Sequence, residues 1–122
     1  MRIFDPDDYK IIQDWFYGHH MQAPLASYLP NIGFIEDYYC AGFLVQTDTP
    51  IALIDFVVTN PVAQLRARAE AVHSIIDTLI KEAKRRGFKA VKCDTQKRSI
   101  AKLSVPFKFA DLGNFHTFYR EL

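Results

Sequence analysis

The chain has few cysteines and no excess of charge of one sign. Its 122 residues include two cysteines, Cys40 and Cys93, both within apolar stretches. A small secreted protein held by disulfides would need more of them, so the sequence indicates thiols in a reducing cytoplasm. Fifteen basic residues face fourteen acidic ones, and the net charge is +1. This balance argues against a nucleic-acid or anionic-membrane partner, because no overall field attracts one.

Long hydrophobic runs are also lacking. No apolar run approaches the ~20 residues that span a bilayer, and the segment Met1–Pro6 lacks the apolar core of a signal peptide. Hydrophobic residues nevertheless make up 49% of the chain and aromatic residues 14%, which excludes a disordered protein. We therefore expect a cytoplasmic protein with residues 1–122 folded as a single domain.

The N-terminal part predicts a short strand and two helices. Arg2–Phe4 has strand character and ends at the turn formers Asp5 and Pro6. Asp7 or Asp8 is expected to cap a helix that ends near Gly18. Its apolar face consists of Ile11, Ile12, Trp15 and Phe16. A second, shorter helix is expected over Ala23–Leu29.

Apolar stretches then predict a sheet. Antiparallel strands are expected over Ile32–Ile35, Cys40–Val45 and Ile51–Val58, because turn residues separate these stretches. The third is almost wholly apolar, which predicts a central strand buried on both faces.

The clearest helix follows, with apolar residues three or four positions apart over Leu65–Ala83. Gly87 provides a left-handed stop, and the basic residues before it are expected to form a solvated helix end. Phe88–Cys93 is the next predicted strand, and this connection indicates a parallel neighbour. A short helix over Lys97–Ser104 and a hairpin over Phe107–Leu122 complete the prediction.

This order of elements resembles the GNAT acyltransferases, and its compactness is similar to that of small phage-encoded members. The resemblance implies an α/β (α+β) fold: a mixed, mostly antiparallel sheet with a splayed central strand pair, flanked by helices. The family's acyl-CoA signature opens its main helix with Arg or Gln, two residues, Gly, one residue, then Gly or Ala. The segment that matches it is Arg66, Ala67, Arg68, Ala69, Glu70 and Ala71.

The signature has a physical basis. The first turn of a helix leaves backbone amides without intrahelical partners, and these suit the pyrophosphate of coenzyme A. Arg66 and Arg68 would add charge-assisted hydrogen bonds to phosphate oxygens. Ala69 stands where the family usually has glycine.

The resemblance also implies where the rest of the donor lies. The pantetheine arm would enter a gap beside the strand Ile51–Val58 and pair with the backbone of Phe56, Val57 and Val58. On the other side of the gap the resemblance places Cys93, Asp94, Thr95 and Gln96, with Ser99 as a further contact.

The implied reaction is the transfer of an acetyl group from acetyl-CoA to a primary amine by direct attack. Such an amine must lose a proton, and Asp55 is our candidate base. The alternative for Asp55 is a bond to a neighbouring backbone amide or a place on the solvent side of the sheet. Ser104 occupies the position of the family's tyrosine acid. The sequence lacks that tyrosine and has Ala69 in place of the family's glycine. Both differences favour the alternative function, a catalytically inactive GNAT-like binding or assembly module.

The acceptor pocket implied by the resemblance would include Trp15, His19, His20 and Tyr28, although ordinary aromatic packing of the first two helices explains these residues equally well. A metal site is not expected, because adjacent histidines in an extended segment point apart and no third ligand has suitable spacing. The edge of the final hairpin would allow a homodimer.

Overall fold

The computed structural model describes residues 1–93. The helix predicted over 97–104 and the hairpin predicted over 107–122 lie outside these residues. The described elements, in chain order, are β1 (Arg2–Ile3), η1 (Pro6–Asp8), α1 (Tyr9–Gly18), η2 (Ala26–Tyr28), β2 (Ile32–Glu36), β3 (Cys40–Val45), β4 (Ile51–Thr59), α2 (Leu65–Arg85) and β5 (Ala90–Cys93).

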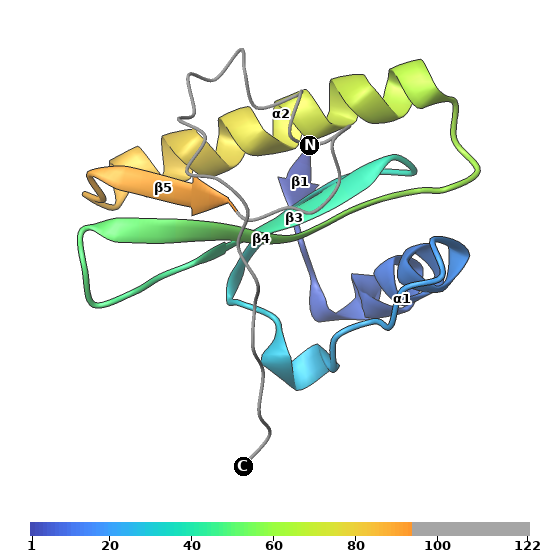
Figure 1. Ribbon diagram of the computed structural model, residues 1–122, viewed down its shortest axis with the longest axis horizontal. Coiled ribbons are helices and arrows are strands. Elements are labelled where there is room, and N and C mark those ends of the chain that lie inside the picture. The colour runs from blue at the N-terminus through green and yellow to red at the C-terminus, as the bar shows by residue number, and fades with distance from the viewer. Residues whose placement is uncertain (94–122) are drawn as a thin grey trace.

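Five strands form one sheet in the order β1-β2-β3-β4-β5. The first four pair antiparallel, whereas β4 and β5 are parallel, as the crossover through α2 predicted. The long helix α2 covers one face of the sheet, and α1 lies on the opposite side (Figure 1). The predicted fold class, a mixed and mostly antiparallel sheet flanked by helices, is confirmed.

The larger part of the core lies between α2 and the sheet. The apolar stripe of α2 buries its side chains against those of β3 and β4, and this removal of apolar surface from water stabilises the layer. Its buried members are Ala71, Val72, Ile75, Ile76, Leu79 and Ala83. The helix lies close to the sheet at Gly42, where an added Cβ atom would stand 2.6 Å from Cγ2 of Ile75. Gly42 therefore sets the depth at which α2 packs.

A second core cluster lies under α1. It contains Ile12, Trp15, Phe16, Ile35, Ala41, Phe43 and Val58. The rings of Phe4 and Phe43 meet edge to face at a centroid distance of 4.9 Å, and Phe43 is fully buried. Both faces of the sheet thus carry apolar layers.

The C-terminal end of α2 confirms the predicted stop at Gly87, whose φ is +88°. The amide of Phe88 donates to the carbonyl of Ala83 (3.0 Å) and the amide of Gly87 donates to that of Lys84 (3.0 Å), which forms a Schellman motif. Arg85 and Arg86 both donate to Glu82, and these bonds lower the pKa of its carboxyl to about 2. The basic residues there form an exposed helix end, as predicted.

The cap of α1 differs from the prediction. The carboxylate of Asp5 accepts from the amide of Asp7 and caps η1, whereas Asp8 makes no side-chain cap at the start of α1. Asp8 instead accepts from two nitrogens of Arg2, each at 2.8 Å. This pair joins β1 to the start of α1, and it lowers the pKa of the Asp8 carboxyl.

Two further expectations were wrong. The helix predicted over Ala23–Leu29 is only the 3₁₀ turn η2, because prolines stand at positions 24 and 30 and a residue before proline is forced out of the helical region. Leu29, with ψ 140°, shows this effect.

Strand β4 is not buried on both faces, since Ile51 and Asp55 are exposed. Within residues 1–93, no helix is long and apolar enough to cross a membrane.

Candidate active site

Strand β4 carries an irregularity at Phe56, whose φ is +53°. The β3–β4 register passes from Ala41↔Val58 to Phe43↔Asp55, so Phe56 and Val57 together stand opposite the single residue Gly42. Two residues facing one is a β-bulge, and the left-handed backbone of a bulky phenylalanine is strained. Such strain persists only where the surroundings enforce it, which marks this point of the sheet as a candidate functional position.

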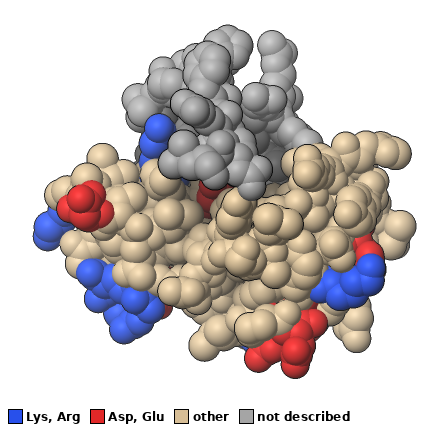
Figure 2. Space-filling view, turned by 90° about the horizontal axis from the view of Figure 1, so that it is seen from below, with Lys and Arg blue, Asp and Glu red and all other residues tan. Residues whose placement is uncertain are grey.

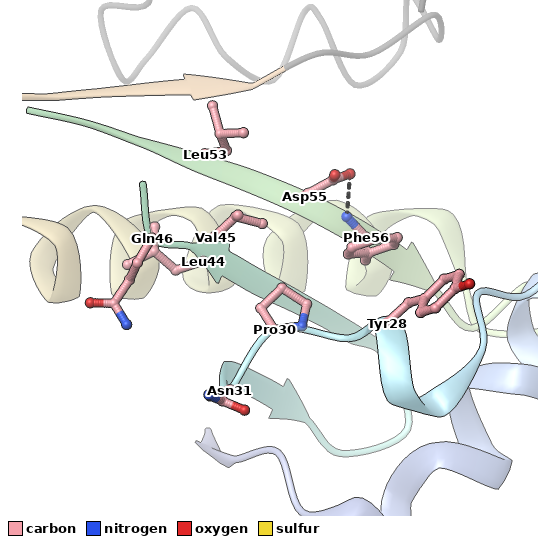
Figure 3. Close-up of a pocket in the computed structure, with 9 residues that line it drawn as sticks. All are labelled: Tyr28, Pro30, Asn31, Leu44, Val45, Gln46, Leu53, Asp55 and Phe56. Atoms are coloured by element: carbon pink, nitrogen blue, oxygen red, sulfur yellow. Dashed lines mark hydrogen bonds between the residues drawn. The ribbon is translucent and has the colours of Figure 1, made fainter. Parts of the chain in front are cut away.

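The bulge brings the side chains of Asp55 and Phe56 to the same cavity on the face opposite α2. The ring of Phe56 packs edge to face on Phe43 at a centroid distance of 6.3 Å. Asp55 is exposed, and its Oδ1 accepts a hydrogen bond of 2.7 Å from the amide of Phe56 (Figure 3). Asp55 therefore holds the strained amide and also presents its carboxylate to solvent.

Strands β4 and β5 pair in parallel over the described part of β5. The register runs from Ile51↔Ala90 to Ile54↔Cys93, whereas β4 continues to Thr59. The bulge residue Phe56 lies in this continuation, beyond the described pairing with β5. The predicted contacts Phe56, Val57 and Val58 all belong to this part of β4.

The N-terminus of α2 follows the same end of β4. Its N-cap residue, Gln64, makes no side-chain cap hydrogen bond, and no acidic residue lies in the first turn. The first intrahelical bond runs from the amide of Arg68 to the carbonyl of Gln64 (3.0 Å). The amides of Leu65, Arg66 and Ala67 precede it and lack intrahelical acceptors, as at any helix start.

The family pattern also fits two residues earlier than the predicted match. In this placement Gln64 takes the first position and Ala69 the last, with Ala67 in place of the glycine. The small residue Ala67 then lies among the free amides. Ala69, Glu70 and Ala71 instead lie inside the helix. Gln64 is thus a candidate donor-site residue that the sequence analysis did not identify. Locating the start of the helix at Leu65 would have pointed to it.

The two arginines of the segment differ in environment. Arg66 is almost fully exposed, and its Nε lies 3.6 Å from Oε1 of Glu70. Arg68 precedes Ala71 and Val72 by one turn on the stripe of α2 that faces the sheet. Its Nε is buried and has no hydrogen-bond partner among residues 1–93. A buried donor without an acceptor is costly, so Arg68 suits an anionic ligand at this end of the sheet.

Three contacts position the loop between β4 and α2. Nε2 of His19, just after α1, lies 2.9 Å from the carbonyl oxygen of Thr59. The amide of Asn60 donates to the carbonyl of Tyr39 at 2.8 Å. Gly18 lies so close to Pro61 that an added Cβ atom would stand 2.4 Å from its Cγ. The end of α1 and the β2–β3 turn therefore hold the start of α2 in place.

A cavity of about 550 Å³ opens beside the bulge, on the face away from α2 (Figure 3). Residues of the segment before β2, of the end of β3 and of β4 surround it. They are Tyr28, Pro30, Asn31, Leu44, Val45, Gln46, Leu53, Asp55 and Phe56. Seen from that side, the described surface is largely uncharged, with Lys and Arg side chains in small separate groups (Figure 2).

The predicted pocket residues do not gather at one place. Tyr28 lines the cavity, whereas Trp15 is buried in the core under α1 and His19 contacts Thr59. His20 has a left-handed backbone, with φ +59°. The lining residues of β3 and of the Pro30–Asn31 segment were missed, because their strand pattern carries no sign of which face stays open.

Five predicted site residues lie outside the described residues: Asp94, Thr95, Gln96, Ser99 and Ser104. Within residues 1–93, no three His, Cys, Asp or Glu side chains are grouped so as to hold a metal ion. Burial raises the pKa of the Cys40 thiol to about 12, so this cysteine is not a thiolate nucleophile.

No family model matches the sequence, and no curated protein matches it. Solved structures do match. An acetyltransferase from Trypanosoma brucei superposes with a TM-score of 0.65 at 15% identity, over 99% of this chain and 97% of that one. A putative acetyltransferase from Agrobacterium tumefaciens superposes with a TM-score of 0.63 at 14% identity, over 98% of both chains. A mutant protein from Thermus thermophilus superposes with a TM-score of 0.67 at 14% identity, over 100% of this chain and 98% of that one. The chain has a GNAT-type acetyltransferase fold.

Proposed function

We propose that this chain, folded as one domain, is an N-acyltransferase that moves an acetyl group from acetyl-CoA to a primary amine. The observation that carries the proposal is the start of α2, whose first amides have no side-chain cap and follow directly on β4 with its bulge at Phe56. The fold shared with acetyltransferases supports it.

The pyrophosphate of the donor would lie at the amides of Leu65, Arg66 and Ala67. Helix starts bind phosphate because free amides and the helix dipole both favour an anion. The side chain of Arg66 is exposed and reaches outward for a phosphate oxygen. The buried Nε of Arg68 approaches from the sheet side of the same turn. One arginine would thus serve each side of the helix start.

The pantetheine arm would follow β4 toward Phe56, so that the thioester lies beside Asp55. A neutral amine in the adjoining cavity attacks the thioester carbon, a C–N bond forms and the C–S bond breaks. The amine proton passes to the carboxylate of Asp55, directly or through water, and the thiolate leaves and takes a proton from water or from Ser104. Asp55 supports this role because its carboxylate is exposed at the cavity wall.

Calorimetry with acetyl-CoA tests the donor site. We expect the substitution Arg66→Ala to weaken binding about threefold to tenfold, since one charge-assisted contact at an exposed site is lost. Arg85→Ala is the matched control, because Arg85 lies at the opposite end of α2 and bonds to Glu82. Absence of binding at millimolar acetyl-CoA, or equal losses in both variants, would refute the donor site.

Thiol release separates transfer from the inactive alternative. With acetyl-CoA and an amine acceptor, an active enzyme releases coenzyme A together with an acetylated amine, which mass spectrometry identifies. Binding of acetyl-CoA without release in the presence of any amine would favour the binding or assembly module.

A further inference from the structure

We infer that the cavity beside the β4 bulge selects a small organic amine that carries positive charge and no carboxylate. The assignment of this amine as the acetyl acceptor rests on the proposed function. The preference for a cation does not, because it follows from the described residues that line the cavity.

The first argument is charge. Asp55 is the one described lining residue with a formal charge, and it lies on the cavity wall formed by β4 (Figure 3). Its Oδ1 accepts from the amide of Phe56. Among residues 1–93 no donor binds its other oxygen, so one carboxylate oxygen is available to an ammonium group.

The second argument is the rest of the lining. Pro30, Val45, Leu53 and Phe56 offer apolar surface to a hydrocarbon body, and Asn31 and Gln46 add neutral amides. Two described cations lie near this lining without belonging to it: Lys92 pairs with Leu53 in the β4–β5 register, and Nη1 of Arg86 lies 3.5 Å from Oε1 of Gln46. Arg86 also donates to Glu82 at 2.8 Å, which offsets its charge.

The third argument is size. A cavity of about 550 Å³ falls in the range of ~300–1,000 Å³ that is typical of small-molecule sites. We therefore assign a free amine rather than a protein side chain as the occupant. An amino acid is disfavoured, because its carboxylate would enter the same cavity as Asp55, and none of the described lining residues is a cation.

Matched pairs of acceptors test the inference. Putrescine and ornithine differ by one carboxylate, as do tyramine and tyrosine. We expect kcat/KM with acetyl-CoA to favour each amine over its parent amino acid by roughly tenfold, because a carboxylate held ~4 Å from Asp55 is repelled. Calorimetric titration of the same four compounds into the protein should give the same order.

The substitution Asp55→Asn isolates the charge. The asparagine Oδ1 still accepts from the amide of Phe56, so the bulge is kept, while the negative charge is lost. Because Asp55 is also the proposed base, the preference is measured here as calorimetric affinity, and we expect it to fall below about threefold for each amine. Asp48→Asn is the matched control, since Asp48 is exposed in the turn between β3 and β4 and does not line the cavity. An unchanged preference in Asp55→Asn, or a preference for amino acids in the unmodified protein, would overturn the inference.

The outcomes for the two proposals are separable. Acetyl-CoA binding with turnover but no preference for amines would refute the inference and leave the transferase proposal intact. Amine binding in the predicted order without acetyl-CoA binding would refute the transferase and support the cation site.

Discussion

Nε2 of His19 lies 2.9 Å from the carbonyl oxygen of Thr59 and 3.1 Å from its Oγ1, and this contact ties the end of α1 to the end of β4. The residues that follow Thr59 lead directly to the start of α2. A side chain far from the proposed donor site in sequence therefore helps to position its amides.

Loss of this contact should lower stability. For His19→Ala we expect a decrease of about 1 kcal/mol in the free energy of unfolding, because a partly buried carbonyl loses its donor. Denaturant unfolding measures it. His20→Asn is the control, since asparagine tolerates the left-handed backbone of His20, and it should change stability by less than about 0.5 kcal/mol. Equal effects of the two substitutions would contradict the anchoring role.

Gln64→Asp should stabilise the protein and weaken donor binding together. An aspartate at this N-cap would accept from the free amides of the first turn and stabilise α2 by about 1 kcal/mol. The same carboxylate would occupy and repel the phosphate site, so we expect acetyl-CoA affinity to fall at least about tenfold.

Thermal unfolding and calorimetry on the same sample of Gln64→Asp give both values. Gln64→Ala, which neither caps nor adds charge, is the control: it should leave stability nearly unchanged and weaken acetyl-CoA binding much less than Gln64→Asp does. Tighter or equal acetyl-CoA binding in Gln64→Asp would place the phosphates elsewhere.

Gly42→Ala should loosen the packing of α2. The new Cβ atom would stand 2.6 Å from Cγ2 of Ile75, so the helix must shift, at a cost of about 1–3 kcal/mol. Adding Ile75→Ala removes Cγ2, the atom that the new Cβ would meet, so the double substitution should cost less than the sum of the two single ones. Urea unfolding of the single and double variants measures the coupling, and simple additivity would show that the two residues do not press on each other.

The pair Arg2–Asp8 predicts acid sensitivity. The Arg2 guanidinium lowers the pKa of the Asp8 carboxyl in the folded state, so its stabilisation is complete above the unfolded value of about 3.8. It is then lost as pH falls below that value toward the folded pKa. Asp8→Asn should lower stability by about 1–2 kcal/mol at pH 7 and flatten the fall in stability below pH 4.

Unfolding free energies measured from pH 2 to 7 test this. Asp14→Asn is the control, because the ion pair of Asp14 with Lys10 is exposed on both sides and should contribute less than about 0.5 kcal/mol. Parallel pH profiles for wild type and Asp8→Asn would contradict the prediction.

The sequence predicted the features that depend on local patterns. The strand β3, the helix α2 and the stop at Gly87 follow from alternation, helical spacing and backbone freedom, which are properties of neighbouring residues. The GNAT-type fold followed from their order. The short helix before Pro30 was wrong because the pattern of apolar residues was given more weight than the two prolines.

Less of the candidate site could be predicted from the sequence. The bulge at Phe56 arises from the register against β3 and is invisible in the composition of β4. The sequence identified Asp55 as a candidate base and left two alternatives open: a bond to a neighbouring backbone amide, or exposure on the solvent side of the sheet. The structure shows the bond to the amide of Phe56, and it also shows that Asp55 is exposed. The cavity depends on which side chains of β3 and β4 stay uncovered, a tertiary property.

The bulge has a consequence for how this protein can diversify. Ala52 and Ile54 lie under α2, while Leu53, Asp55 and Phe56 line the cavity, so neighbouring positions of one strand serve different layers. Substitutions that reshape the cavity therefore leave the packing of the helix almost untouched. A lineage can change the ligand it accepts without re-optimising its main core, provided that the chain keeps its extra residue opposite Gly42.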